Sequence, residues 1–331
     1  MRVLMFTNMY PYDGDSSYGI FVKEQVDALR AESIEIDVLF INARRNKLSY
    51  ISGIIQFIRK CNRSKYHLIH AQHTFCAAIA LLQRKIPVIL TFHEGEASAT
   101  LTMKLREIIR KPYKFLVCSF NLKKLIIKLV DEVIFVVRYH KDLFGTNKGV
   151  VIPCGIDLSL FRPIQTKLTR SKLGLSNDRK IVLFPSSPKV IGKRFDIAKE
   201  AIQIVRNRGV DVELISLNNI PHKEVPLYMN ASDITLFTSD YEASPMVIKE
   251  AMACNVPIVS ADVGDTKEII GNTKGCFICE RDPQDVAREI RVALDYGRRT
   301  EGRERIIELG LDLQQVSRTI IRIYRETLRR S

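Results

Sequence analysis

The sequence lacks the features that would assign it to several common protein classes. Its 331 residues contain no run of 18 uncharged apolar residues, so no membrane-spanning helix is expected. The segment Met1 to Thr7 has neither the basic region nor the cleavage site of a signal peptide. Neither G-x-G-x-x-G nor G-x-x-x-x-G-K-[ST] occurs, which argues against a nicotinamide dehydrogenase and a P-loop NTPase.

Cysteines are few and give no sign of a disulfide or zinc framework. The chain has seven, an odd number, mostly within apolar runs, which favours reduced thiols in a cytoplasmic compartment. Cys276 and Cys279 form one C-x-x-C without a second pair at zinc-ribbon spacing, so we expect them to pack in a strand. His67, His70 and His73 recur every third residue, but side chains at this spacing on a strand diverge, which favours a structural role. No metal site is predicted.

Acidic residues are scarce relative to basic ones, 37 against 51, which gives a formal charge of +14. Most of the excess lies in residues 1–150, which carry 23 Lys and Arg against 13 Asp and Glu. In residues 101–128, Lys and Arg interleave with Leu, Ile and Phe, and Glu107 is the only acid. Such a region suits an anionic membrane surface, or else forms two helices with lysine-rich outer faces. No helix-turn-helix, zinc finger or RNP-type motif indicates nucleic acid.

Short apolar runs alternate with amphipathic segments, which predicts an α/β protein, and the length suits two domains. Helices are expected within 42–65 and over 20–32, 195–209, 222–229, 282–295 and 313–328. Strands are expected over 1–7, 36–41, 67–73, 87–92 and 132–137 in the first half and over 180–184, 212–217, 234–238, 256–260 and 275–279 in the second.

The densest stretch is a βαβ unit within Asp233 to Glu268. Between its two strands we expect a helix with Ser244 as N-cap and Pro245 at the first helical position. The loop before this helix lies at the carboxyl end of a strand, where open α/β sheets bind ligands.

Two glutamates, Glu242 and Glu250, flank the start of that helix. A helix N-terminus suits phosphate, and ionised carboxylates accept hydrogen bonds from sugar hydroxyls. Together they indicate a site for a sugar nucleotide.

The same stretch resembles the retaining family 4 glycosyltransferases, whose architecture of two Rossmann domains is called GT-B. A second match is VVIPCGIDLSLF at Val150 to Phe161, with Cys154 where the family has Asn. Ala243 and Asp265 stand where the family usually has Gly. The matching residues of the central stretch are Glu242, Pro245, Val247, Glu250 to Ala253, Pro257, Val259, Gly264 and Glu268.

The resemblance implies an α/β fold of two Rossmann-like domains that face a cleft. Residues 1–149 would form the acceptor-side domain and 150–311 the domain that binds the nucleotide sugar. Residues 312–331 would form a C-terminal helix that crosses back to pack on the first domain.

The resemblance also implies roles for individual residues. Glu242 and His93 would meet the donor sugar, and Glu250 the ribose. Lys193 would neutralise the leaving diphosphate, with Lys189 or Arg194 as the second positive charge. Backbone groups are expected to hold the diphosphate at Gly19, Pro245, Met246 and Val247.

The expected reaction is retaining transfer of a hexosyl group from a nucleoside diphosphate (NDP) sugar to an acceptor hydroxyl, without a metal or other cofactor. A lipid-linked or polysaccharide acceptor in cell-envelope synthesis is expected, with the enzyme in the cytoplasm or on the inner face of the membrane. Two alternatives stay open. One is a sugar-nucleotide 2-epimerase-like isomerase on the same architecture. The other is a basic protein that docks on anionic membrane or RNA through residues 101–128.

Overall fold

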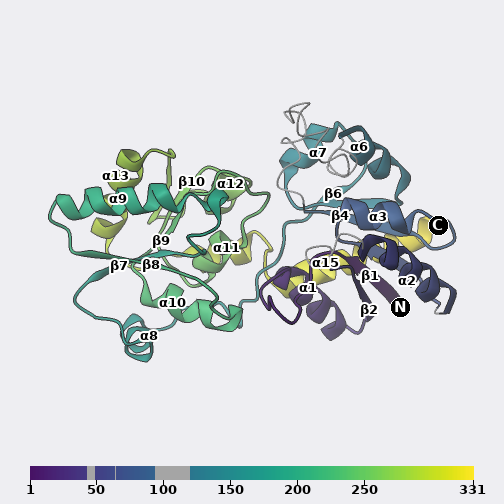
Figure 1. Ribbon diagram of the computed structural model, residues 1–331, viewed down its shortest axis with the longest axis horizontal. Helices are drawn as coiled ribbons and strands as arrows, with labels where there is room; N and C mark the ends of the chain where they lie inside the picture. Colours follow the sequence, from purple (N-terminus) through teal and green to yellow (C-terminus); the bar gives the residue numbers. More distant parts are fainter. Residues whose placement is uncertain (43–48, 64, 94–119) are drawn as a thin grey trace. The chain divides into compact units, whose positions relative to one another are not determined.

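The computed structural model describes residues 1–42, 49–63, 65–93 and 120–331, which form two compact units (Figure 1). Unit 1 contains Met1–Gly155 and Leu313–Ser331, and unit 2 contains Ile156–Asp312. The change of unit falls later than the predicted start of the second domain at residue 150. The reason is that β6 (Val150–Val151) pairs with β5 (Glu132–Phe135) and completes the sheet of unit 1.

Unit 1 has a six-stranded sheet in the order β2-β1-β3-β4-β5-β6. Its other strands are β1 (Arg2–Thr7), β2 (Glu35–Phe40), β3 (Leu68–Ala71) and β4 (Val88–Phe92). Every strand pairing in the described residues is parallel. In β1, Leu4 and Phe6 face one helical layer and Val3 and Met5 face the other, because successive strand residues point to opposite faces.

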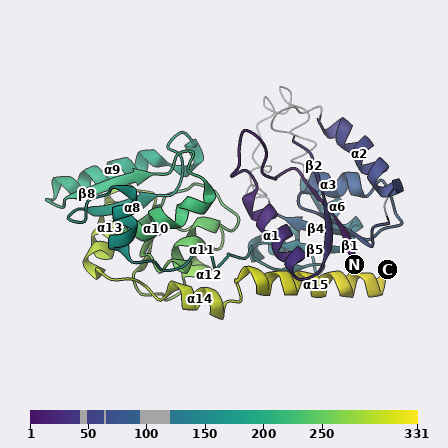
Figure 2. The ribbon, with the colours of Figure 1, turned by 90° about the horizontal axis from the view of Figure 1, so that it is seen from below.

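Helices cover both faces of this sheet. α2 (Ser49–Arg63), α3 (Thr74–Ala80), α6 (Phe120–Leu129) and α7 (Arg138–Phe144) share one core cluster. On the opposite face α1 (Ile20–Ala31) lies beside α15 (Leu313–Arg330), so the last helix of the chain belongs to the first unit (Figure 2). Among the described residues no helix is long and apolar enough to cross a membrane.

Unit 2 has a five-stranded parallel sheet in the order β11-β10-β9-β7-β8. The strands are β7 (Lys180–Phe184), β8 (Val212–Ser216), β9 (Ile234–Phe237), β10 (Ile258–Ala261) and β11 (Cys276–Cys279). Cys276 and Cys279 are thus strand residues, as predicted.

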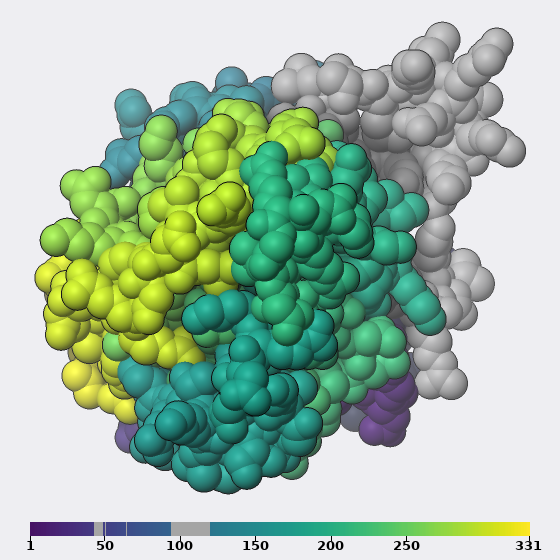
Figure 3. Space-filling model, turned by 90° about the vertical axis from the view of Figure 1, so that its left-hand side faces the viewer, coloured from purple at the N-terminus to yellow at the C-terminus, as the bar shows by residue number. Residues whose placement is uncertain are grey.

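The helices of unit 2 also form two layers. α9 (Phe195–Asn207) and α13 (Pro283–Tyr296) pack together on one face and cover the upper part of the surface in Figure 3, in green and yellow-green. The other face carries α10 (Val225–Ala231), α11 (Met246–Ala253), α12 (Thr266–Ile270) and α14 (Gly302–Glu308), and α8 (Thr166–Leu173) packs on α10. Two short 3₁₀ turns, η2 (Ile191–Lys193) and η3 (His222–Glu224), follow β7 and β8.

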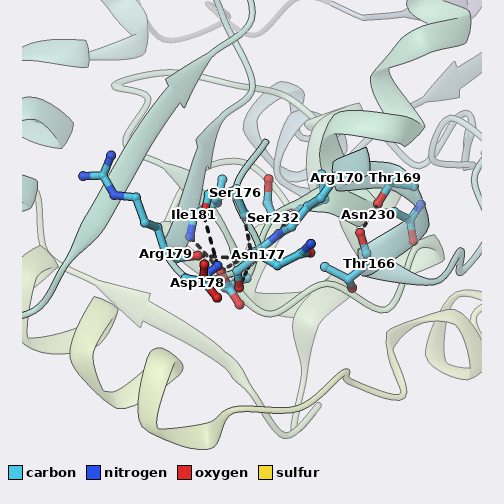
Figure 4. A network of polar contacts seen from close by, with 12 residues as sticks. Thr166, Thr169, Arg170, Ser176, Asn177, Asp178, Arg179, Ile181, Asn230 and Ser232 are labelled. Atoms are coloured by element: carbon cyan, nitrogen blue, oxygen red, sulfur yellow. Dashed lines mark hydrogen bonds and ion pairs between the residues drawn. The ribbon is translucent and has the colours of Figure 1, made fainter. Parts of the chain in front are cut away.

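A buried arginine fixes the amino-terminal edge of this sheet (Figure 4). The guanidinium of Arg170 donates to carbonyls of the 176–179 loop and, at 2.8 Å, to Ala231 O. It also pairs at 2.7 Å with Asp233, which accepts the N–H of Ile181 at 2.6 Å. One cation therefore joins α8 to the starts of β7 and β9, at the end of the sheet opposite the predicted ligand site.

The histidines near β3 have separate partners. The ring of buried His70 lies between the hydroxyls of Tyr324, 2.5 Å away, and Thr91, 2.6 Å away. His73 caps α3 by accepting a backbone N–H, and His67 accepts a backbone N–H from the start of β1. These contacts agree with the structural role expected for His70 and His73.

The basic segment 101–128 lies outside the described residues up to position 119, and α6 covers the rest. There Lys123 departs from the alternative of helices with lysine-rich outer faces. Lys123 is buried with its ammonium 5.8 Å from the centre of the Phe92 ring, whereas Leu125 and Leu129 are half exposed. The reason is helical geometry: with 100° per residue, Lys123 shares the inward face of Ile126, and its aliphatic stem can be buried.

Candidate functional site

The helix expected to hold phosphate, α11, begins at Met246, later than predicted. Pro245 is its N-cap, and no side chain of the described residues caps it, so the N–H groups of the first turn point to the carboxyl edge of the sheet without an acceptor among those side chains. Ser244 is not the cap because its hydroxyl is already engaged. It donates to the carboxylate of Asp265 at 2.6 Å and accepts from the buried ammonium of Lys249 at 2.6 Å.

Lys193 and Glu242, both predicted catalytic residues, form an ion pair. They lie on the loops after β7 and β9, which are neighbours in the sheet, so their side chains meet at its carboxyl edge. The backbone holds the two loops together: Thr238 Oγ1 donates to Lys193 O at 3.0 Å, and the N–H of Asp240 donates to Gly192 O at 2.9 Å. The side chains remain 28% and 21% exposed, so both can reach a ligand.

The two residues considered for a second positive charge differ sharply. Arg194 has a left-handed backbone, with φ of 54°, and donates to Asp196 at 2.8 Å and to Asp240 at 3.1 Å. These hydrogen bonds, chiefly the one to Asp196, raise the pKa of Arg194 above its ordinary value. Lys189 is exposed, and no carboxylate of the described residues is paired with its ammonium. Lys189 is therefore the less neutralised cation of this loop.

Glu250, the residue expected to meet the ribose, is buried and has a histidine partner. Nε2 of His222 in η3 donates to Glu250 Oε1 over 3.2 Å, and the His222 ring packs against Phe161 at 5.3 Å between centroids. This contact could not be predicted from the sequence, because η3 follows β8 and α11 follows β9. It orients one carboxylate oxygen and leaves the other to accept a hydroxyl.

Gly264 brings the loop after β10 against the loop of Glu242. Its φ is +58°, and a Cβ there would lie 2.7 Å from the carbonyl carbon of Ala243 and 3.0 Å from Glu242 O. Only glycine fits this approach without strain. The loop after β10 thus packs against the backbone at Glu242 and supports its position.

In unit 1, Gly19 is the N-cap of α1, with φ of 65°. A Cβ at this position would lie 2.7 Å from Met9 O. The glycine therefore allows the loop after β1 to lie directly on the start of α1, at the carboxyl edge of the sheet of unit 1.

His93 follows β4 at the same edge and is held on both ring nitrogens. Nε2 lies 2.6 Å from Gln72 Oε1, and since that oxygen can only accept, Nε2 carries the hydrogen. Nδ1 faces the thiol of Cys154 at 3.7 Å, and Phe21 packs on the ring. Gln72 follows the neighbouring strand β3, so its position after a strand was a signal that sequence reasoning missed. Cys154, noted only as a replacement for Asn, is the second support.

Comparison with known families matches both halves of the chain. The model described as Glycosyltransferase Family 4 matches residues 17–160, and the one described as Glycosyl transferases group 1 matches residues 190–310. Two Rossmann-like units define the GT-B fold class. The chain belongs to the family 4, group 1 glycosyltransferases.

Named relatives differ in how much they share with this chain. The D-inositol 3-phosphate glycosyltransferase of Geodermatophilus obscurus is 22% identical over 74% of this chain, which spans 58% of that protein. The D-inositol 3-phosphate glycosyltransferase of Streptosporangium roseum is 20% identical over 72% of this chain and 64% of its own length. The putative teichuronic acid biosynthesis glycosyltransferase TuaC of Bacillus subtilis is 25% identical over 88% of this chain and 88% of its own length.

Solved structures confirm the fold. Sucrose-phosphate synthase of Thermosynechococcus elongatus superposes with a TM-score of 0.77 at 18% identity and full coverage of both chains. HepE of Anabaena, solved with UDP, superposes with a TM-score of 0.70 at 16% identity, covering 98% of this chain and 100% of its own.

Proposed function

We propose that this protein transfers a sugar from an NDP-sugar to an acceptor hydroxyl with retention of the anomeric configuration. The observation that carries the proposal is the Lys193–Glu242 pair beside the uncapped start of α11. The sugar of a nucleotide sugar is bound through acceptors for its hydroxyls, and the phosphate attached to it is bound through positive charge. The carboxylate of Glu242 and the ammonium of Lys193 offer an acceptor and a positive charge side by side at this edge of the sheet.

The difficult step is the departure of the diphosphate, which gains negative charge while the anomeric carbon becomes cationic. Lys193 and the N–H groups of Met246 and Val247 would stabilise the departing charge, with Lys189 as the second cation. Arg194 would instead hold the loop, since two carboxylates occupy it. Because these groups supply the charge, we expect turnover without a divalent metal and undiminished turnover in a chelator.

Carboxylates would position the donor. Glu242 would accept from hydroxyls of the sugar and Glu250, oriented by His222, from the ribose. From unit 1 we assign His93 to the donor sugar and the backbone at Gly19 to the diphosphate. Gln72 keeps the hydrogen of His93 on Nε2, so Nδ1 is the acceptor of the ring, and a substrate hydroxyl would have to replace the Cys154 thiol there.

The acceptor we propose is a lipid-linked or polysaccharide hydroxyl of the cell envelope, reached from the cytoplasm. The similarity to TuaC, named for teichuronic acid biosynthesis, supports a polysaccharide pathway. The excess of positive charge in residues 1–150 supports a phosphate-bearing carrier.

The test begins with a thermal-shift screen of UDP-, GDP-, ADP- and CMP-sugars, since a bound ligand stabilises the folded state by mass action. The stabilising donor is then incubated with envelope lipid extract, and both the released nucleotide and the anomeric configuration of the product are measured. Conversion of the sugar nucleotide without an acceptor would instead identify the isomerase. No stabilisation by any sugar nucleotide, together with salt-sensitive RNA binding, would identify the basic binding protein.

A further inference from the structure

A pocket of about 320 Å³ lies at the amino-terminal edge of the sheet of unit 2. Three neighbouring strands begin there, since Lys180 is the first residue of β7, Asp233 precedes β9 and Pro257 precedes β10. Open α/β sheets bind their usual ligands at the opposite edge, where the strands end, and the proposed donor site is at that edge. The pocket, which we call the amino-edge pocket, is therefore separate from Lys193 and Glu242.

Two further segments close the pocket around the strand starts. α8 contributes its first residues, Thr166 and Lys167, and the stretch after α13 contributes Arg298 and Arg299. The chain leaves α13 through Gly297, whose φ of 64° is left-handed, so the helix ends there and the two arginines follow directly. Four of the lining residues are labelled in Figure 4, namely Thr166, Arg170, Asn177 and Ser232.

Positive charge dominates the lining. Among the described residues of the pocket, Asp233 is the one acid, and it already pairs with Arg170 at 2.7 Å and accepts the N–H of Ile181 at 2.6 Å. No carboxylate of the described residues forms an ion pair with the other lining cations, which are Lys167, Lys180, Arg298 and Arg299. The amino-edge pocket thus carries positive charge that the described side chains do not neutralise.

Arg299 is held firmly but lacks an acceptor on one nitrogen. Its Nη2 donates to Thr166 Oγ1 at 2.6 Å and to Asn230 O, which fixes the guanidinium between α8 and α10. Its Nη1 is shielded from water and has no hydrogen-bond partner among the described residues. Burial lowers the pKa of Arg299 below its ordinary value. A desolvated cation without an ion-pair partner is costly, and an anion in the pocket would offset that cost.

Neutral donors lie beside these cations. Thr166 Oγ1 accepts from Arg299, so its own hydrogen is left to donate to a ligand. No side chain of the described residues caps α8, so the backbone N–H groups at Thr166 and Lys167 add positive partial charge at the same wall. Arginine and lysine side chains with such donors suit phosphate oxygens, and the volume suits a compact molecule.

We propose that the amino-edge pocket binds a small phosphorylated molecule, whose phosphate or diphosphate group is held by Arg299, Lys167 and the hydroxyl of Thr166. Lys180 and Arg298, which are exposed, add charge around it. Because the lining comes from α8, from the strand starts and from the end of α13, a bound anion would join these elements and stabilise unit 2. Binding here needs no sugar nucleotide and stands apart from the proposed transfer.

The test uses pyrophosphate as the probe and the full chain with Lys193→Ala, which removes a cation of the donor site. Isothermal titration calorimetry at constant ionic strength should show that pyrophosphate binds this protein and that acetate binds it far more weakly. Adding Lys167→Gln/Lys180→Gln should weaken pyrophosphate binding at least about tenfold, and adding Arg299→Gln should do the same, because each change removes hydrogen bonds to a charged group.

The matched control, Lys199→Gln/Arg325→Gln, removes the same charge from exposed positions outside the pocket and should leave the affinity for pyrophosphate unchanged. Circular dichroism checks that each variant is folded; if Arg299→Gln does not fold, the lysine variant decides, because its two residues are exposed. The proposal is overturned by absence of pyrophosphate binding to the Lys193→Ala protein, by unchanged affinity in the pocket variants, by an equal loss in the control, or by equal binding of acetate. The pocket variants should keep the thermal shift with a sugar nucleotide, which tests the proposed transfer separately.

Discussion

Replacing Lys193 by Ala tests the proposed donor site most directly. The ammonium is the cation held beside Glu242, so its removal takes positive charge from the departing diphosphate and leaves the carboxylate unpaired next to it. Removing one preorganised charge-stabilising group typically lowers kcat about 10²–10³-fold. We expect a loss of turnover of that size for Lys193→Ala.

The cost to folding should be much smaller. The side chains of Lys193 and Glu242 are 28% and 21% exposed, and a partly solvated ion pair contributes at most about 1 kcal/mol to stability. The loops are also joined by backbone contacts that the substitution keeps, such as the bond from Asp240 N–H to Gly192 O. Activity and stability should therefore separate clearly.

The assay follows release of the nucleoside diphosphate with saturating donor and acceptor, alongside urea unfolding. Lys199→Ala, on the exposed side of α9, is the matched control and should keep full turnover. A rate for Lys193→Ala within a few-fold of the parent rate would remove Lys193 from the site. A parallel collapse of stability would show that its role is structural.

Three further predictions concern the fold around the site. Gly264→Ala should lower the free energy of unfolding in urea by at least about 1–2 kcal/mol, because φ is +58° and the new Cβ would press on Ala243; an unchanged midpoint would contradict this. His70 is buried and its pKa is lowered by burial to about 3 from 6.5, so the unfolded chain takes up a proton that the folded chain does not, and stability is lost as pH falls through this window. The free energy of unfolding should fall by about 1.4 kcal/mol per pH unit through the titration of His70, and His70→Gln should flatten its dependence on pH between pH 6.5 and pH 3. Lys249→Met should destabilise by about 3–5 kcal/mol, since it leaves the buried Asp265 carboxylate without its cation, and adding Asp265→Ala should restore part of that stability.

Much of the fold follows from local sequence pattern. Lys180 to Phe184 forms β7 with the predicted bounds. A short apolar run between polar segments is buried by forming a strand inside a parallel sheet, and the polar residues on either side set its ends. β10 begins at Ile258 and not at Val256 for a specific reason. The N–H of Val256 donates to Ala251 O and still closes the end of α11, with Asn255 in a left-handed conformation.

The site residues could be named from motifs, but their partners could not. The pairing of Lys193 with Glu242 depends on β7 and β9 being neighbours, a property of the sheet order. The contact of His222 with Glu250 likewise joins loops after different strands. Local periodicity carries no information on such pairings, since it fixes which residues are buried and not which loops meet.

Three positions at which the sequence departs from the family pattern make contacts close to the proposed site. Asp265 replaces a usual glycine, and its carboxylate holds the hydroxyl of Ser244, directly before α11. Cys154 replaces a usual asparagine, and its thiol lies against the ring of His93. Ala243, also in place of glycine, is buried against Gly264. Because Gly264 has no Cβ, the backbone of Ala243 can lie directly on it. Cys154 thus contacts a proposed site residue directly, whereas Asp265 and Ala243 support the loop between Glu242 and the start of α11. Substitutions at Ser244, Asp265 and Cys154 should therefore change the position of a reacting group more than the charge of the site, and their effects should appear in kcat before they appear in donor affinity.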